Sequence, residues 1–149
     1  MPRFFRAFLA TCTVFSLSLS AFADREGWLV DYPKAVAQAK AENKLVLLQF
    51  TGSDWNTTCQ KQDAEVFAKP AFKEYAAKNL VLLEVDFPKK KELPQPVADQ
   101  NKDLNSKYSI RTFPTLVVVN GEGEEVGRLI GYGGGGADLV VAKLDAFRK

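Results

Sequence analysis

Cys59 is the residue of this sequence best suited to covalent chemistry. It ends the segment Asn56-Thr-Thr-Cys59, which follows a short apolar run and the polar loop 51–55. A cysteine is nucleophilic as its thiolate, and a place in the first turn of a helix favours that form. The 149 residues contain no histidine. This weakens any hypothesis of a zinc site or a Cys–His catalytic pair, and we expect no bound metal.

The N-terminal residues have the layout of a cleaved secretory signal. A short basic start over residues 1–6 precedes a mostly apolar stretch over residues 7–22, and an Ala-x-Ala sequence ends at Ala23. The apolar stretch is shorter than the roughly 20 residues that a membrane-spanning helix needs, and serine and threonine interrupt it. We therefore predict a signal peptide over residues 1–23, with export to the periplasm or secretion.

Cleavage after Ala23 would leave residues 24–149 as a single domain, long enough to bury a hydrophobic core. It would also remove Cys12, so Cys59 would be the only cysteine. An unpaired cysteine in an exported protein suggests a reactive thiol, a buried thiol or an intermolecular disulfide such as a Cys59-linked dimer. The remaining charge is close to neutral and no further apolar segment could span a membrane. We therefore expect neither a nucleic-acid partner nor a stable membrane span.

Strands and helices alternate along the rest of the chain. The predicted strands are short apolar runs typical of strands buried on both faces, and the predicted helices include amphipathic segments. The strands are predicted at 45–50, 80–87, 115–119 and 125–130, and the helices at 32–43, 58–68, 70–78, 97–108 and 137–147. A hairpin turn, Asn120-Gly-Glu-Gly, joins the last two strands, and the proline-rich and lysine-rich segment 88–96 is predicted to be a solvated loop. This order predicts an α/β fold: a central mixed sheet of parallel strands plus a C-terminal antiparallel hairpin, with helices on both faces.

Four segments, in this order, resemble the thioredoxin family. Phe50-Thr-Gly-Ser-Asp-Trp55 is similar to the approach to the Cys-x-x-Cys motif, and Asp86-Phe-Pro88 to a strand end in a subgroup of exported bacterial members. Thr112-Phe-Pro-Thr115 resembles the cis-proline segment, and Gly131-Tyr-Gly-Gly before the last helix also fits. The resemblance covers nearly all of residues 26–149. It implies a thioredoxin fold, a relation to thiol-disulfide oxidoreductases and no cofactor.

The sequence departs from the family at one position of the motif. Asn56 occupies the place of the first cysteine, which attacks substrate disulfides in the family, and Cys59 matches the second, resolving cysteine. Gln49 matches the place where the family often has a buried acid. Disulfide exchange needs a thiolate to attack and a second thiol to resolve the mixed disulfide. The cleaved monomer is therefore predicted not to cycle between dithiol and disulfide forms.

The first functional hypothesis is a redox-inactive module that binds a peptide or protein partner in the cell envelope. The resemblance implies a groove lined by Trp55, Thr112, Phe113 and Pro114. A cis Phe113–Pro114 bond would leave backbone groups exposed for strand-like pairing with an extended peptide. The alternative for Trp55 and Phe113 is that they only cap the core.

The second hypothesis is a monothiol enzyme in which Cys59 forms mixed disulfides or reduces a peroxide, and another thiol regenerates it. Thr57, Thr58 and the Asn56 amide could supply hydrogen bonds at this turn. Peroxiredoxins resemble this arrangement, since their attacking cysteine also matches the second position. Burial in apolar surroundings raises the pKa of a thiol. The exposure of Cys59 therefore discriminates between a reactive thiol and an inert one.

Overall fold

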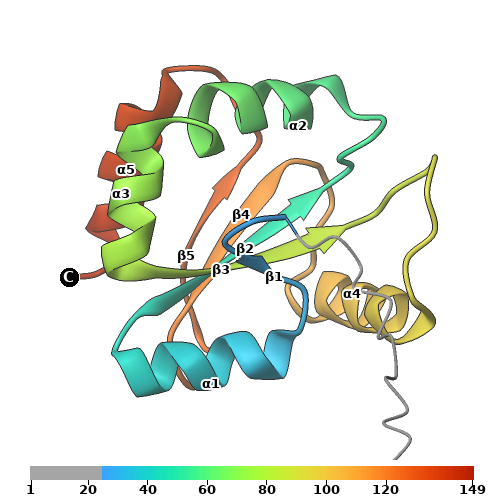
Figure 1. Ribbon diagram of the computed structural model, residues 1–149, viewed down its shortest axis with the longest axis horizontal. Helices are drawn as coiled ribbons and strands as arrows, with labels where there is room; N and C mark the ends of the chain where they lie inside the picture. Colours follow the sequence, from blue (N-terminus) through green and yellow to red (C-terminus); the bar gives the residue numbers. More distant parts are fainter. Residues whose placement is uncertain (1–24) are drawn as a thin grey trace, which may run out of the picture.

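A five-stranded mixed sheet forms the centre of the computed structural model, which describes residues 25–149 (Figure 1). The strands are β1 (Trp28–Leu29), β2 (Leu45–Thr51), β3 (Leu80–Asp86), β4 (Thr115–Val119) and β5 (Glu125–Ile130), in the spatial order β1-β3-β2-β4-β5. β1, β3 and β2 are parallel, whereas β4 runs antiparallel to both β2 and β5. The predicted mixed sheet with its C-terminal hairpin is confirmed. The predicted signal peptide lies outside the described residues.

Helices cover both faces of the sheet. They are α1 (Tyr32–Glu42), α2 (Thr57–Gln62), α3 (Pro70–Asn79), α4 (Gln95–Lys107) and α5 (Gly136–Ala146). Figure 1 shows α2, α3 and α5 on one side of the sheet and α1 and α4 on the other. Within residues 25–149, none of the helices has both the length and the apolar character needed to cross a membrane.

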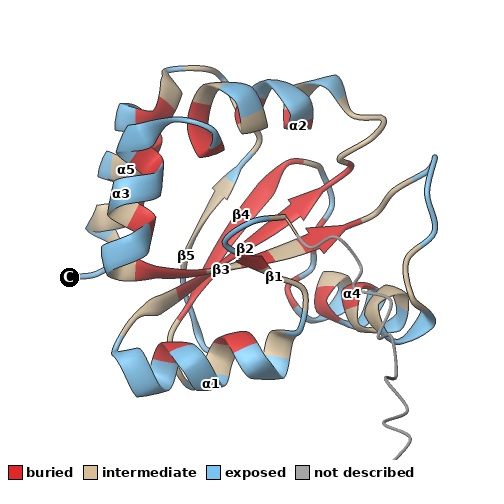
Figure 2. Ribbon diagram, in the orientation of Figure 1, coloured by how far each residue is buried: buried red, intermediate tan, exposed pale blue. Residues whose placement is uncertain are grey.

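The central strands are buried on both faces, which explains their continuous apolar sequences (Figure 2). Leu47 of β2 packs into one core with Phe72 of α3 and Leu144 of α5. Its neighbour Leu48 points to the opposite face and joins a second core with Leu104 of α4. The two cores hold β2 and β3 rigidly, so the loops that follow their carboxyl ends start from fixed positions.

Two features differ from the sequence prediction. No strand was predicted at β1, because its two residues are too few to show a periodic pattern. The helix predicted over 58–68 is wrong in its second half: α2 ends at Gln62, and a π-helical turn, Asp63–Phe67, follows. In this wider turn the Ala68 N–H donates to the Asp63 carbonyl. The Asp63 side chain is meanwhile bonded to the sheet through Gln49.

Candidate functional site

Cys59 lies in the first turn of α2, where the chain leaves the carboxyl end of β2. Asn56 is the N-cap of this helix, in an extended conformation with φ −96° and ψ 111°. Its Oδ1 accepts the Cys59 backbone N–H at 3.0 Å, the usual N-cap bond. The Cys59 residue has 0% exposure and forms no disulfide. The thiol is therefore covered by protein and inaccessible to a large substrate in this conformation.

The other end of the Asn56 amide reaches across to the cis-proline segment. Its Nδ2 donates to the Phe113 carbonyl in a long hydrogen bond of 3.4 Å. Asn56 thus joins the start of α2 to the loop before β4. Thr57 is exposed and Thr58 half-buried. Within the described part of the chain, no hydrogen bond joins either hydroxyl to Cys59, and the contribution of the two threonines stays a prediction.

Three aromatic side chains form a ridge beside this turn, which we call the aromatic ridge: Trp55, Phe87 and Phe113. Phe87 and Phe113 stack, with ring centroids 5.1 Å apart, and Trp55 meets Phe113 edge-on at 6.2 Å. The Trp55 Nε1–H donates to the Phe87 carbonyl at 2.8 Å. All three are half-buried, so the ridge presents part of its surface to solvent. The sequence prediction named Trp55 and Phe113 but not Phe87, although its Asp-Phe-Pro motif contained that residue.

The peptide bond between Phe113 and Pro114 is cis, as the resemblance implied. Pro114 is buried, and its carbonyl accepts the Gly131 N–H at 2.8 Å. The Thr112 carbonyl accepts the Thr115 hydroxyl at 2.8 Å. Among the described residues the Phe113 N–H has no acceptor, so it is a backbone donor that an added peptide strand could use.

The loop after β3 is fastened to the loop before α2. Both carboxylate oxygens of Asp54 accept backbone N–H groups, from Lys89 at 2.9 Å and from Lys90 at 2.8 Å. The Lys89 bond, with a smaller contribution from Lys90, lowers the pKa of the Asp54 carboxyl from its usual value. The Lys89 ammonium also lies 3.8 Å from the centre of the Trp55 ring. The lysines at 89–91 belong to the segment that was predicted to be a solvated loop. This segment therefore also borders the candidate site.

A second attachment between the same loops is made by Asp86, whose residue is 4% exposed. Its carboxylate accepts the Ser53 N–H at 3.0 Å and the Ser53 hydroxyl at 2.5 Å, and pairs with the Lys91 ammonium at 3.4 Å. The Asp86 backbone carbonyl accepts the Asn101 amide of α4 at 3.0 Å. Because a buried charge is stable only when it is paired and hydrogen-bonded, these contacts fix the geometry of the loop before α2.

Beneath α2, Gln49 occupies the buried position that the resemblance matched to an acid. It is 0% exposed and sits between two opposite charges. Its Oε1 accepts from Arg25 Nη1 at 3.0 Å, and its Nε2 donates to Asp63 Oδ1 at 2.9 Å. Arg25 also pairs directly with Asp63 at 3.4 Å. An amide can serve both neighbours at once, so Gln49 completes a neutral polar network where an acid would add a negative charge.

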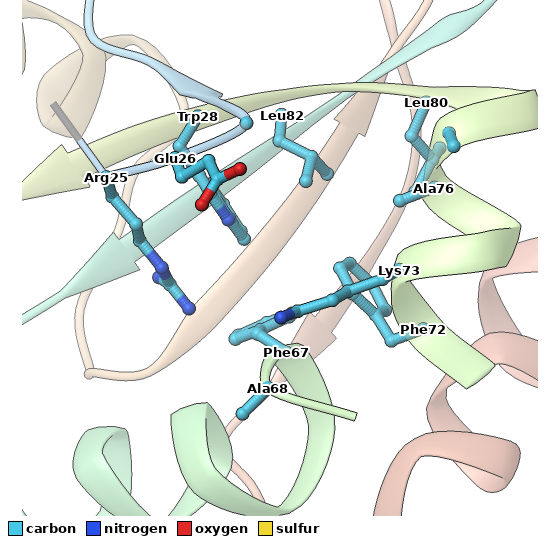
Figure 3. A pocket seen from close by; sticks show the side chains of 12 residues that line it. Arg25, Glu26, Trp28, Phe67, Ala68, Phe72, Lys73, Ala76, Leu80 and Leu82 are labelled. Carbon is cyan, nitrogen blue, oxygen red and sulfur yellow. The ribbon is translucent and has the colours of Figure 1, made fainter. Parts of the chain in front are cut away.

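A separate apolar cavity of about 500 Å³ opens between β1 and α3. Figure 3 shows Arg25 at its mouth, with the guanidinium 4.4 Å from the centre of the Trp28 ring. The Lys73 side chain extends over the same cavity from α3 (Figure 3). Its lining contains neither Cys59 nor the aromatic ridge, so this cavity lies apart from the candidate site.

Glu84 of β3 should make stability depend on pH. Burial, and secondarily the nearby Asp86 charge, raises the pKa of Glu84. A carboxyl whose folded pKa exceeds its unfolded pKa contributes stability below the unfolded value and loses it as pH rises through the folded value. We expect Glu84→Gln to raise the melting temperature by a few degrees at about pH 8 and hardly at all at about pH 4.

The matched control for this measurement is Glu74→Gln, on the exposed surface of α3. It should change the melting temperature equally little at both pH values. An equal gain from Glu84→Gln at the two pH values would contradict the assignment, because the effect would then not depend on ionisation.

Residues 25–149 contain no group of three or more His, Cys, Asp or Glu side chains placed to hold a metal ion.

Comparisons with known proteins agree on one family. A Thioredoxin-like domain model matches residues 32–145. The disulfide bond reductase DsbH of Chlamydia pneumoniae is 34% identical over 118 residues, which cover 79% of this chain and 70% of the relative. The thioredoxin-related protein DsbJ of the same organism is 31% identical over 106 residues, covering 71% of this chain but only 30% of DsbJ.

Solved structures give the same result. A DsbH oxidoreductase structure superposes with a TM-score of 0.76 at 33% identity, covering 80% of this chain and 82% of that one. A solution structure of a thioredoxin from Thermus thermophilus gives a TM-score of 0.61 at 24% identity, covering 80% and 84% of the two chains. The latter likeness concerns the fold alone.

Proposed function

The chain belongs to the thioredoxin-like domain family and is related to the DsbH disulfide bond reductase, and from this premise we propose that it is an exported peptide- or protein-binding module. In this proposal Asn56 replaces the first cysteine of the family's Cys-x-x-Cys motif. The protein then performs no dithiol exchange and acts in the cell envelope by binding a partner.

The proposal rests on the burial and the hydrogen bonding of the turn at the start of α2. Cys59 is fully buried, and the position three residues before it is held by an amide that bonds both Cys59 N–H and the Phe113 carbonyl. A disulfide exchange cycle requires an accessible attacking thiolate and a second thiol to resolve it. Asn56 supplies no thiol of either kind. Its two hydrogen bonds instead hold the start of α2 against the cis-proline segment.

Support for binding comes from the surface beside that turn. The aromatic ridge is partly exposed, and the Phe113 N–H lacks an acceptor among the described residues. Half-exposed aromatic side chains next to a free backbone donor are suited to an extended peptide, which needs apolar contacts and main-chain pairing.

Export is proposed from the N-terminal sequence. The basic start, the apolar stretch and the Ala-x-Ala end support a signal peptide over residues 1–23 and a single domain over residues 24–149, in the periplasm or secreted. A location outside the cytoplasm would also be compatible with a domain whose one cysteine is buried. A buried thiol is shielded from oxidation and from intermolecular pairing, and a Cys59-linked dimer would require the turn to open.

The monothiol enzyme is the competing function, and the reactivity of Cys59 separates the two. In the full chain carrying Cys12→Ser, Cys59 is the one thiol. We expect it to react with a thiol reagent at least about 100-fold more slowly in the folded protein than in denaturant, since labelling requires local or global opening. The measurement is the labelling rate at several pH values, with matched reagent concentrations.

The control is Thr57→Cys in the same background, because residue 57 is exposed in the same helical turn. Its new thiol should label rapidly while Cys59 remains protected. Rapid labelling of Cys59 itself in the folded protein would favour the monothiol enzyme and would overturn the proposed binding-only role.

A further inference from the structure

Positive charge gathers along one side of the aromatic ridge. The segment 88–93 contains three lysines and one glutamate. Lys89 and Lys90 are exposed and follow Phe87 of the ridge after a single intervening residue, Pro88. The two contacts that Asp54 makes with their backbone amides hold this part of the loop in place, so these ammonium groups start from a fixed backbone.

Next to the ridge lies a small pocket of about 210 Å³. Its lining combines an apolar floor with lysine side chains: Asp86, Phe87, Pro88, Lys91, Leu93, Ala98, Asn101 and Lys102. Phe87 belongs both to this pocket and to the ridge, so the two surfaces are continuous. The volume is sufficient for one large apolar side chain, and Lys102 of α4 adds another exposed cation at the rim.

Two of the acids near this surface, Asp54 and Asp86, are already engaged, and Glu92 of the same loop is exposed. Asp86 is buried and is bonded to Ser53 and Lys91. Asp54 has both oxygens bonded to backbone amides. In contrast, within residues 25–149, Lys89, Lys90 and Lys102 form no ion pair with a carboxylate. Three cations without a carboxylate partner therefore lie at or beside the pocket: Lys102 lines it, and Lys89 and Lys90 belong to the loop next to it.

We propose that the partner of this site is an acidic peptide segment that places a large apolar side chain against Phe87 and carboxylates against Lys89, Lys90 and Lys102. This inference rests on the proposed binding function and names the chemistry of the partner. Such complementarity would determine which segments bind, because apolar contact alone does not distinguish among exposed aromatic or aliphatic side chains.

The test is fluorescence polarisation with the purified full chain and three labelled five-residue probes of equal length. Each probe has a central phenylalanine, flanked on both sides by two glutamates, two serines or two lysines. At low salt we expect the glutamate probe to bind about tenfold more tightly than the serine probe, and the lysine probe to bind most weakly. The advantage of the glutamate probe should shrink at high ionic strength, because exposed charge pairs are screened.

Two variants assign the effect to this surface. Lys90→Glu combined with Lys102→Glu should remove the preference for the glutamate probe and leave binding of the serine probe within about twofold. Lys78→Glu combined with Lys143→Glu, on the exposed surfaces of α3 and α5, is the control matched in charge, and it should change neither the preference nor the binding of the serine probe.

The possible outcomes separate this inference from the function on which it rests. Equal binding of the glutamate and serine probes, with loss of both in Phe113→Ala, would overturn the acidic preference and retain peptide binding. A glutamate preference that survives the double lysine variant would also overturn the assignment to these cations. Absence of binding by every probe would contradict the proposed function together with the inference.

Discussion

Replacing Asn56 by cysteine is expected to give the protein strong disulfide reductase activity. Residues at positions i and i+3 of a helical turn lie about 5–6 Å apart at Cβ, a spacing from which small local adjustment gives disulfide geometry. The new thiol would occupy the N-cap of α2, where the helix dipole and unpaired N–H groups favour a thiolate. Cys59 would then serve as the resolving thiol, attacking the mixed disulfide that the new cysteine forms with a substrate.

The measurement is reduction of insulin disulfides by Asn56→Cys in a Cys12→Ser background, with dithiothreitol as the terminal reductant. The initial rate should exceed that of the parent protein by at least about tenfold, since the parent has no thiol at position 56. The oxidised variant should also contain an internal disulfide and no free thiol. The loss of the Asn56 cap should reduce stability by about 1 kcal/mol, too little to unfold a domain of this size.

Two matched variants test the roles of the two sulfurs. Asn56→Ser retains an N-cap side chain without adding a thiol and should stay inactive. Asn56→Cys combined with Cys59→Ser retains the attacking thiol but cannot resolve, so it should accumulate a mixed disulfide with substrate. If Asn56→Cys folds, forms its internal disulfide and still fails to reduce insulin, the match between this turn and the family's motif would be wrong.

The fold could be predicted wherever local sequence decides the structure. The runs that became β2, β3 and β4 are apolar on both sides because two separate cores bury them, and that pattern is visible without a structure. β1 could not be predicted, because its two residues pair with Leu82 and Leu83 through contacts distant in sequence. The π-helical turn likewise coincides with a side-chain bond from Asp63 to Gln49 on a neighbouring strand.

The candidate site likewise has features that the local sequence predicts and features that it does not. Asn56, Cys59 and the cis bond before Pro114 could be predicted because they belong to a local motif. The connections that fix them could not. Asp54 bonds the backbone of Lys89, 35 positions later, and the lysine run that looked like a solvated loop became part of the site wall. Nothing in a run of lysines indicates which ammonium group will lie over a tryptophan ring.

Asp86→Ala is expected to destabilise the fold strongly and to expose Cys59. The substitution leaves the Ser53 N–H, the Ser53 hydroxyl and the Lys91 ammonium without their carboxylate partner. Loss of the two hydrogen bonds from Ser53 to a buried carboxylate should cost about 3 kcal/mol in total, whereas the Lys91 side chain is 53% exposed and regains water at little cost. Urea denaturation should show a loss of that order with an unchanged slope, since the surface exposed on unfolding hardly changes.

Asp86→Asn is the matched control, because its amide oxygen can still accept one bond from Ser53 while the charge opposite Lys91 is lost. It should lower the free energy of unfolding by less than Asp86→Ala does.

The labelling rate of Cys59 then distinguishes two reasons why this thiol is protected. If global unfolding limits labelling, Asp86→Ala should accelerate it by the same factor by which it raises the unfolding constant. A larger acceleration would mean that the fastened loops themselves cover the thiol, and no acceleration despite the loss of stability would contradict any role of Asp86 in closing the site.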